Sequence, residues 1–76
     1  MYVANKIHFY ANFQGMYINK LFTFEVNGMQ ACLRILKQFV ERGNIIKAVY
    51  ITAVNHETGE VINEKQSVEE LMMRIF

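Results

Sequence analysis

The chain has 76 residues, enough for one small domain, and 53% of them are hydrophobic. A domain of this length buries only about 60% of the surface that its unfolded chain exposes, so surplus apolar surface tends to be covered by another chain. Eight basic and seven acidic residues nearly balance, whereas nucleic-acid-binding domains usually carry a clear basic excess. The charge therefore counts against a dedicated nucleic-acid-binding domain.

The cysteine content and the apolar runs indicate where the protein works. A single cysteine, Cys32, cannot form an internal disulfide, which excludes a small secreted domain stapled by disulfides. The sequence shows no signal-peptide pattern, and its apolar runs are far shorter than the roughly 20 residues of a membrane span. We expect a cytoplasmic protein without membrane association. No proline, repeat or linker interrupts the chain, so residues 1–76 are predicted to form a single domain.

The first predicted element is a β-hairpin over residues 7–26, with a tight turn at Gln14-Gly15. Apolar and polar side chains alternate with the period of two that is typical of a half-buried antiparallel pair. In the predicted register, Phe9 stands opposite Lys20. The inward face is expected to carry Lys20 among apolar residues: Ile7, Phe9, Ala11, Phe13, Met16, Ile18, Phe22, Phe24 and Val26. Most of the aromatic rings of this stretch are therefore predicted to lie in the core.

The outward face of the same hairpin is the first candidate binding surface. Its residues combine large contact areas with adaptable hydrogen bonding, as antibody paratopes do. They are His8, Tyr10, Asn12, Tyr17, Asn19, Leu21 and Thr23. Tyrosine is also common on solvated strand faces that bind nothing, so both interpretations remain open from the sequence.

A helix follows, with Asn27 predicted as its N-cap. From Met29 to Val40 apolar residues recur every three or four positions, and Gly43 stands where a left-handed C-cap is expected. Residues 45–54 are β-branched and apolar on both faces, which predicts a strand that is central or covered on both sides. The sequence leaves open which of its faces packs on the helices.

A three-residue turn with Gly59 at a bulge position leads to a shorter, more polar strand over residues 60–66, predicted at a sheet edge. The sequence SVEE, from Ser67 to Glu70, is a capping box that begins a terminal helix. The apolar stripe of this helix comprises Val68, Leu71, Met72 and Ile75. The predicted order is ββαββα, an α+β two-layer sandwich in which a four-stranded antiparallel sheet carries two helices on one face.

No motif for catalysis, metal binding or nucleotide binding is present. His8 and His56 have no ligand cluster beside them, and a zinc site needs about four ligands. Cys32 lies on the apolar stripe of the first helix and is expected to be a small buried hydrophobe. The glutamate pairs of the second turn and the terminal helix have structural explanations. We therefore expect no catalysis, no cofactor and no metal.

The favoured function is a non-catalytic protein-binding module, a homodimer that uses the open face of its sheet. Such a module serves as a small regulator or inhibitor of an unidentified protein, and the composition alone suggests a phage or another mobile element as its source. A second candidate surface is the terminal helix with Met72, Met73, Ile75 and Phe76, whose methionines suit an adaptable interface. Whether Met73 and Phe76 belong to the core or to an interface is open.

The alternative function is a single-stranded nucleic-acid-binding domain. In this interpretation Tyr10 and Tyr17 stack on bases. Lys6, Lys20 and Lys47 approach the phosphates, although Lys20 is predicted to point inward. The net charge of only +1 disfavours this alternative.

Overall fold

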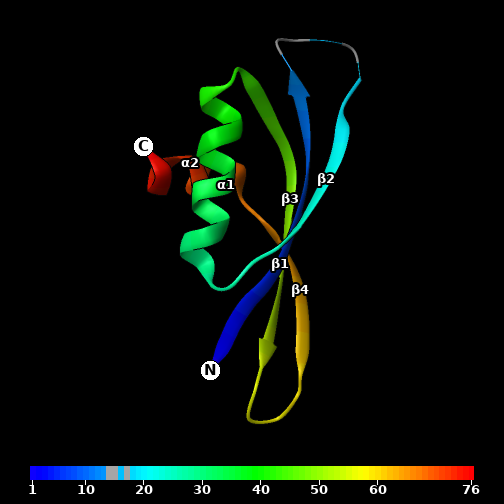
Figure 1. The fold of residues 1–76 in the computed structure, drawn as a ribbon, viewed down its shortest axis with the longest axis vertical. Coiled ribbons are helices and arrows are strands. Elements are labelled where there is room, and N and C mark those ends of the chain that lie inside the picture. Colours follow the sequence, from blue (N-terminus) through cyan, green and yellow to red (C-terminus); the bar gives the residue numbers. More distant parts are fainter. Residues whose placement is uncertain (14–15, 17) are drawn as a thin grey trace.

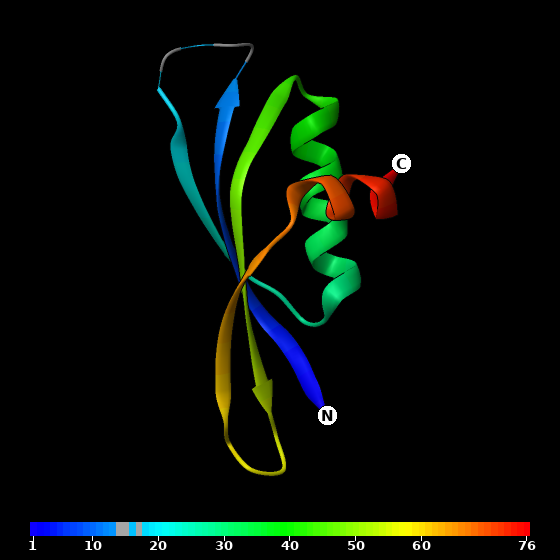
Figure 2. The same cartoon turned by 180° about the vertical axis from the view of Figure 1, so that it is seen from behind.

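The structure is a computed structural model that describes residues 1–13, 16 and 18–76 (Figure 1). Its elements are β1 (Tyr2–Phe13), β2 (Lys20–Glu25), α1 (Met29–Glu41), β3 (Asn44–Asn55), β4 (Val61–Gln66) and α2 (Val68–Ile75). The strands form one antiparallel sheet in the order β2-β1-β3-β4. Both helices lie on the same side of this sheet (Figure 1 and Figure 2). The predicted ββαββα fold is confirmed.

The pairing of β1 with β2 differs from the predicted register by two residues. Phe9 stands opposite Phe22 rather than Lys20, and the tight turn predicted at Gln14-Gly15 lies outside the described residues. A shift of two keeps each side chain on its predicted face because side chains alternate along a strand with period 2. The division of the hairpin into inward and outward residues is therefore unaffected by the wrong register.

The core lies between the sheet and the two helices. Phe9 is completely buried, and its ring lies 5.9 Å from Phe22, 6.2 Å from Phe24 and 5.0 Å from Phe39, measured between ring centroids. The buried hydrophobic residues are Ala4, Ile7, Phe9, Ala11, Cys32, Leu36, Ile46, Val49, Ile51 and Leu71. These residues come from β1, β3 and both helices, so the core joins the two layers.

The described residues at the end of β1 and before β2 are not covered by the helical layer. β3 begins at Asn44, opposite Phe13, and α1 ends at Glu41. Phe13, Met16 and Ile18 were predicted in the core, but they are 46, 59 and 69% exposed. That prediction was wrong because an inward-facing side chain is buried only where a second layer lies over it.

β3 turns Ile46, Val49 and Ile51 toward the helices, and all three are buried. Their spacing departs from a period of two because the register with β1 shifts between Phe9 and Ala11. At this β-bulge two residues of β3, 47 and 48, stand opposite one residue of β1. β3 is a central strand between β1 and β4, as predicted, and β4 is an edge strand.

The helix ends explain how the chain enters and leaves the helical layer. Gly28, rather than the predicted Asn27, is the N-cap of α1, with φ of 97° and no side-chain cap. The Gly28 N–H donates to the Ala4 carbonyl at 2.8 Å, which ties the start of the helix to β1. Gly43 follows α1 with φ of 92° and donates its N–H to the Val40 carbonyl at 3.0 Å. The predicted left-handed turn at Gly43 is confirmed.

The second half of the chain follows its predicted local signals closely. The hydrogen bond from the Asn55 N–H to the Glu60 carbonyl closes a turn of residues 56–59, one residue longer than predicted. Ser67 is the N-cap of α2, and its hydroxyl oxygen accepts the Glu70 N–H at 3.3 Å. The helix begins where the capping box predicts.

Candidate binding surface

The face of the sheet opposite the helices is not covered by any described element (Figure 2). We call it the outer face. Its side chains alternate with the buried residues of the same strands. Following the strand pairing, it comprises Val3, Lys6, His8, Tyr10 and Asn12 of β1, Leu21, Thr23 and Glu25 of β2, Ile45, Tyr50, Thr52 and Val54 of β3, and Val61, Asn63 and Lys65 of β4.

An aromatic pair occupies the middle of the outer face. Thr23 pairs with His8, His8 with Tyr50, and Tyr50 with Lys65, so one row of side chains crosses all four strands. The rings of His8 and Tyr50 are stacked, with centroids 5.0 Å apart and an interplanar angle of 16°. Each ring is half-buried by its neighbours. The stack gives the outer face a flat, preformed centre.

One end of the outer face is apolar. Tyr10 pairs with Leu21, and Asn12 pairs with Ile45. Tyr10, Leu21 and Ile45 are 40, 54 and 50% exposed. The side-chain amide of Asn12 donates to the Met16 carbonyl, which holds this side chain to the end of the hairpin. Three large apolar groups are thus grouped beside the aromatic pair.

The other end of the outer face is mixed. A polar row follows the aromatic row, with Lys6 paired to Glu25 on one side and Thr52 on the other. Beyond it Val54 pairs with Val3 and Val61. The face therefore combines apolar side chains near both ends with a polar row that carries charges of both signs, a composition typical of protein interfaces with a polar rim.

Five of the seven predicted binding residues share the outer face: His8, Tyr10, Asn12, Leu21 and Thr23. Asn19 is exposed in the segment before β2 and is not part of the sheet. Tyr17 lies outside the described residues.

The contribution of β3 and β4 to the outer face was missing from the sequence prediction. Tyr50 is the most important residue that was missed, because it completes the aromatic pair. The apolar character of residues 45–54 on both faces conceals which face each residue takes. The only sequence signal was the β-branched character of residues 45–54, which predicts a strand in the same sheet.

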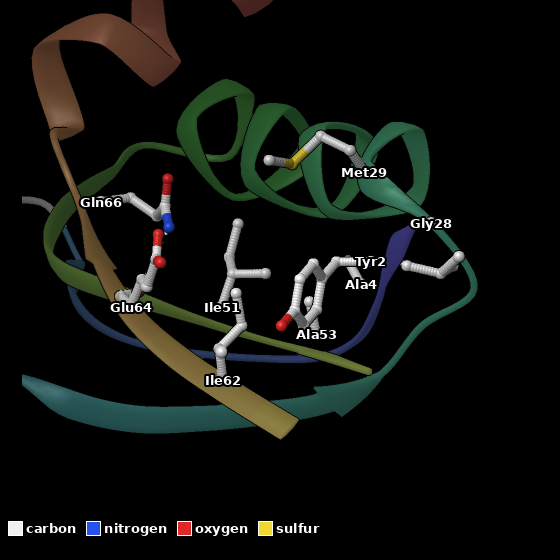
Figure 3. Close-up of a pocket in the computed structure, with 10 residues that line it drawn as sticks. Tyr2, Ala4, Gly28, Met29, Ile51, Ala53, Ile62, Glu64 and Gln66 are labelled. Atoms are coloured by element: carbon white, nitrogen blue, oxygen red, sulfur yellow. Dashed lines mark hydrogen bonds between the residues drawn. The ribbon is translucent and has the colours of Figure 1, made fainter. Parts of the chain in front are cut away.

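A hollow of about 360 Å³ lies on the helix side, at the start of α1. Figure 3 shows Tyr2, Ile51 and Ile62 between the sheet and the first turn of α1. Glu64 is the one charged residue among those that line it. The other titratable group among the described lining residues is the phenol of Tyr2, whose hydroxyl donates to Glu60 and not to Glu64. Glu64 and Tyr2 therefore form no hydrogen-bonded acid–base pair.

Two side chains near the helical layer have shifted pKa values. The Tyr2 hydroxyl donates to a carboxylate oxygen of Glu60. This hydrogen bond raises the pKa of the Tyr2 phenol, with smaller contributions from burial and from the charges of Glu60 and Glu64. Burial raises the pKa of the Cys32 thiol, which is fully enclosed. Cys32 is the small buried residue that the sequence predicts, and a buried, protonated thiol is a poor nucleophile.

Comparisons with protein-family models, with curated proteins and with solved structures found no match. Among the described residues, no group of three histidine, cysteine or acidic side chains is arranged to hold a metal ion. None of the described helices has the length and apolar character needed to cross a membrane. The function has to be inferred from the surfaces of the molecule.

Proposed function

We propose that the chain is a non-catalytic protein-binding module that uses the outer face of its sheet. The first protein that it binds there is a second copy of itself. The observation that carries the proposal is the uneven covering of the sheet. Both helices cover one face, while the other presents Tyr10, Leu21 and Ile45 beside the stacked His8–Tyr50 pair. Clusters of exposed apolar side chains rimmed by polar residues are typical of interaction sites.

The dimensions of the molecule support an assembly larger than one chain. Its accessible surface is 5315 Å², whereas a monomer of 8.9 kDa is expected to expose about 4,800 Å². Its radius of gyration is 12.7 Å, compared with about 11.4 Å expected for a compact domain of this length. Contact between two outer faces would remove part of this surplus surface. Stable interfaces bury roughly 800 Å² on each partner.

In a twofold dimer the same surface serves both copies. The His8–Tyr50 pair and the Tyr10–Leu21 pair would form the centre of the contact. Lys6, Lys65 and Glu25 would lie toward its rim, where charges of both signs can pair across the interface. Aromatic side chains near the centre of an interface contribute most of the binding energy.

Sedimentation equilibrium over low to high micromolar protein concentrations tests the proposal. The wild-type chain should pass from the mass of one chain to that of two. The double variant Tyr10→Ala/Leu21→Ala should remain a single chain, because removing interface anchors costs roughly 2 kcal/mol or more each. Met73→Ala tests the second candidate surface, the terminal helix, where Met73 is exposed and so does not belong to the core. Association should be unchanged in this variant if the outer face alone forms the contact. A wild-type chain that stays monomeric at high micromolar concentration contradicts the dimer.

The wider role in this proposal is that of a small regulator or inhibitor of another protein. It acts in the reducing cytoplasm, where the buried free thiol of Cys32 is maintained. An origin in a phage or another mobile element is part of the same proposal, and it rests on the composition alone.

A second candidate function places single-stranded nucleic acid on the same face. The observation that favours it is the His8–Tyr50 stack, with Lys65 in the same row. An aromatic ring that stacks on a base contributes roughly 1–3 kcal/mol. Lys20 lines the opposite side of the sheet and does not contribute, and the near-neutral charge still disfavours this function. Titration with labelled oligonucleotides at low salt separates the two: absence of binding at tens of micromolar removes the nucleic-acid candidate, and salt-independent binding argues against phosphate contacts.

A further inference from the structure

A second hollow, of about 630 Å³, lies on the helix side of the sheet, away from the outer face. It is bounded by described residues at the end of β1 and before and within β2, and by the C-terminal end of α1. We call it the hairpin groove. Its walls include the three apolar residues that the covering layer does not reach, Phe13, Met16 and Ile18. The outer face and the hairpin groove are on opposite sides of the sheet, so occupation of one leaves the other open.

The hairpin groove continues the hydrophobic core toward solvent. Phe22 and Phe39 also line it, and their ring centroids lie 4.7 Å apart in an edge-to-face arrangement. Both rings also contact Phe9 in the core. An apolar segment in the groove would therefore rest on a packed aromatic base. The volume of the hairpin groove is within the range of about 300–1,000 Å³ typical of ligand sites.

Among the described residues that line the hairpin groove, the charged ones are Lys20 and Arg42, both positive, and none is a carboxylate. Three carbonyls in the last turn of α1, those of Gln38, Phe39 and Val40, have partners within the chain. The Arg42 N–H donates to Gln38, and the side-chain amide of Asn44 donates to Phe39. The Arg42 side chain is consequently not needed to cap the helix, and the apolar groove has a cationic rim.

We propose that the hairpin groove binds a short acidic segment of another protein, one that carries two large apolar side chains next to a carboxylate. The apolar side chains would cover Phe13, Met16 and Ile18, and the carboxylate would pair with Arg42 or Lys20. A charge-assisted contact with arginine is directional and strengthens where water is excluded. The concave shape favours an inserted segment over a flat membrane surface. This inference concerns a different surface from the proposed dimer and holds for either oligomeric state.

Selection from a displayed library of random peptides on the immobilised full chain tests the inference. The enriched peptides should combine two large apolar residues with Asp or Glu. One enriched peptide, synthesised with a fluorescent label, then serves as the probe in anisotropy titrations. Arg42→Glu and Ile18→Ser should each weaken its binding by about tenfold or more, which corresponds to roughly 1.4 kcal/mol. Lys37→Glu, the same change of charge on an exposed α1 residue outside the groove, should leave the affinity unchanged.

A repeated selection on the double variant Lys20→Glu/Arg42→Glu provides a second readout. Its peptides should carry Lys or Arg in place of the acidic residues, and circular dichroism should show that the variant remains folded. The inference is overturned if no peptides are enriched, or if the affinity of the probe is unchanged by Arg42→Glu and Ile18→Ser. It is also overturned if the double variant still selects acidic residues. It is equally overturned if Arg42→Glu instead abolishes self-association or binding to anionic phosphatidylglycerol vesicles. The variant Tyr10→Ala/Leu21→Ala keeps the groove intact, so its binding of the probe separates a failure of the dimer from a failure of this inference.

Discussion

Phe9 is the residue at which the sheet and α1 are joined most closely. It is completely buried and contacts the rings of Phe22, Phe24 and Phe39. Phe9→Ala should lower the free energy of unfolding by roughly 3–5 kcal/mol, a large share of the roughly 4–11 kcal/mol expected for the whole domain. Urea denaturation followed by circular dichroism measures the change. Phe9→Leu should cost clearly less, and equal losses for both variants would contradict the cavity explanation.

The hydrogen bond from Tyr2 to Glu60 should be detectable in the titration of the Tyr2 phenol at high pH. It raises the phenol pKa above its ordinary value of 10.0. Because the folded-state pKa is the higher one, the associated stability is complete below pH 10 and is lost as the pH rises through the folded pKa. Glu60→Ala should bring the Tyr2 pKa back toward 10. Titration of ¹³C-labelled tyrosine by NMR checks this, and an unchanged Tyr2 pKa in the variant would count against the hydrogen bond.

Cys32 should be protected from thiol reagents in the native protein. Its side chain is fully buried, and burial raises its pKa, so both access and the thiolate fraction are low. Ellman's reagent should react slowly in buffer and rapidly, with one equivalent, in concentrated urea. Absorbance at the thionitrobenzoate band follows the reaction. Rapid labelling without urea would mean that α1 opens readily or that the thiol is accessible.

At the level of whole elements, the two helices differ in how their first turns are capped: α2 has a side-chain cap and α1 has none. The Ser67 hydroxyl oxygen accepts the Glu70 N–H, whereas Asn27 is not the N-cap of α1. Ser67→Ala should therefore cost about 0.5–2 kcal/mol, and Asn27→Ala should change stability by no more than about 0.5 kcal/mol. Urea denaturation of both variants gives the comparison. A larger loss for Asn27→Ala would reverse the assignment.

The sequence was sufficient to predict the order of the elements, because each start and end has a local cause. The period of two in residues 7–26 and the period of 3.6 in residues 29–42 determine which side chains face inward. The register of the first hairpin was not predictable in this way, since a shift of two residues leaves the alternation unchanged. The burial of Ile18 was mispredicted for a related reason: the pattern identifies a face but not the length over which another layer covers it.

The candidate surface was predictable only where the alternation is clear. Tyr10 and Leu21 are on a strand pair with distinct apolar and polar faces, so their outward position follows from the pattern. Tyr50 belongs to a strand that is apolar on both faces and contains a β-bulge at residues 47 and 48. Its stacking on His8 depends on long-range pairing, which no local pattern in one strand specifies.

For the molecule as a whole, self-association and stability should be linked. A dimer that forms only from folded chains raises the apparent stability as the protein concentration increases. The melting temperature of the wild-type chain should therefore rise with concentration, while that of Tyr10→Ala/Leu21→Ala should stay constant. Differential scanning calorimetry at several concentrations measures both. A wild-type melting temperature that does not depend on concentration would contradict self-association through the outer face.

The central position of β1 has a consequence for how the chain folds. β1 precedes β3 by about 30 to 50 residues along the chain, yet the two strands pair along most of their length. Contacts between distant segments form slowly, because the intervening loop must close before the pairing stabilises it. During synthesis, the backbone edge of β1 that pairs with β3 therefore stays unpaired until residues 44–55 have left the ribosome, although α1 precedes β3 and can already cover Phe9 and Phe22. A nascent chain that stalls before this point presents an unpaired strand edge to any chaperone or neighbouring chain within reach.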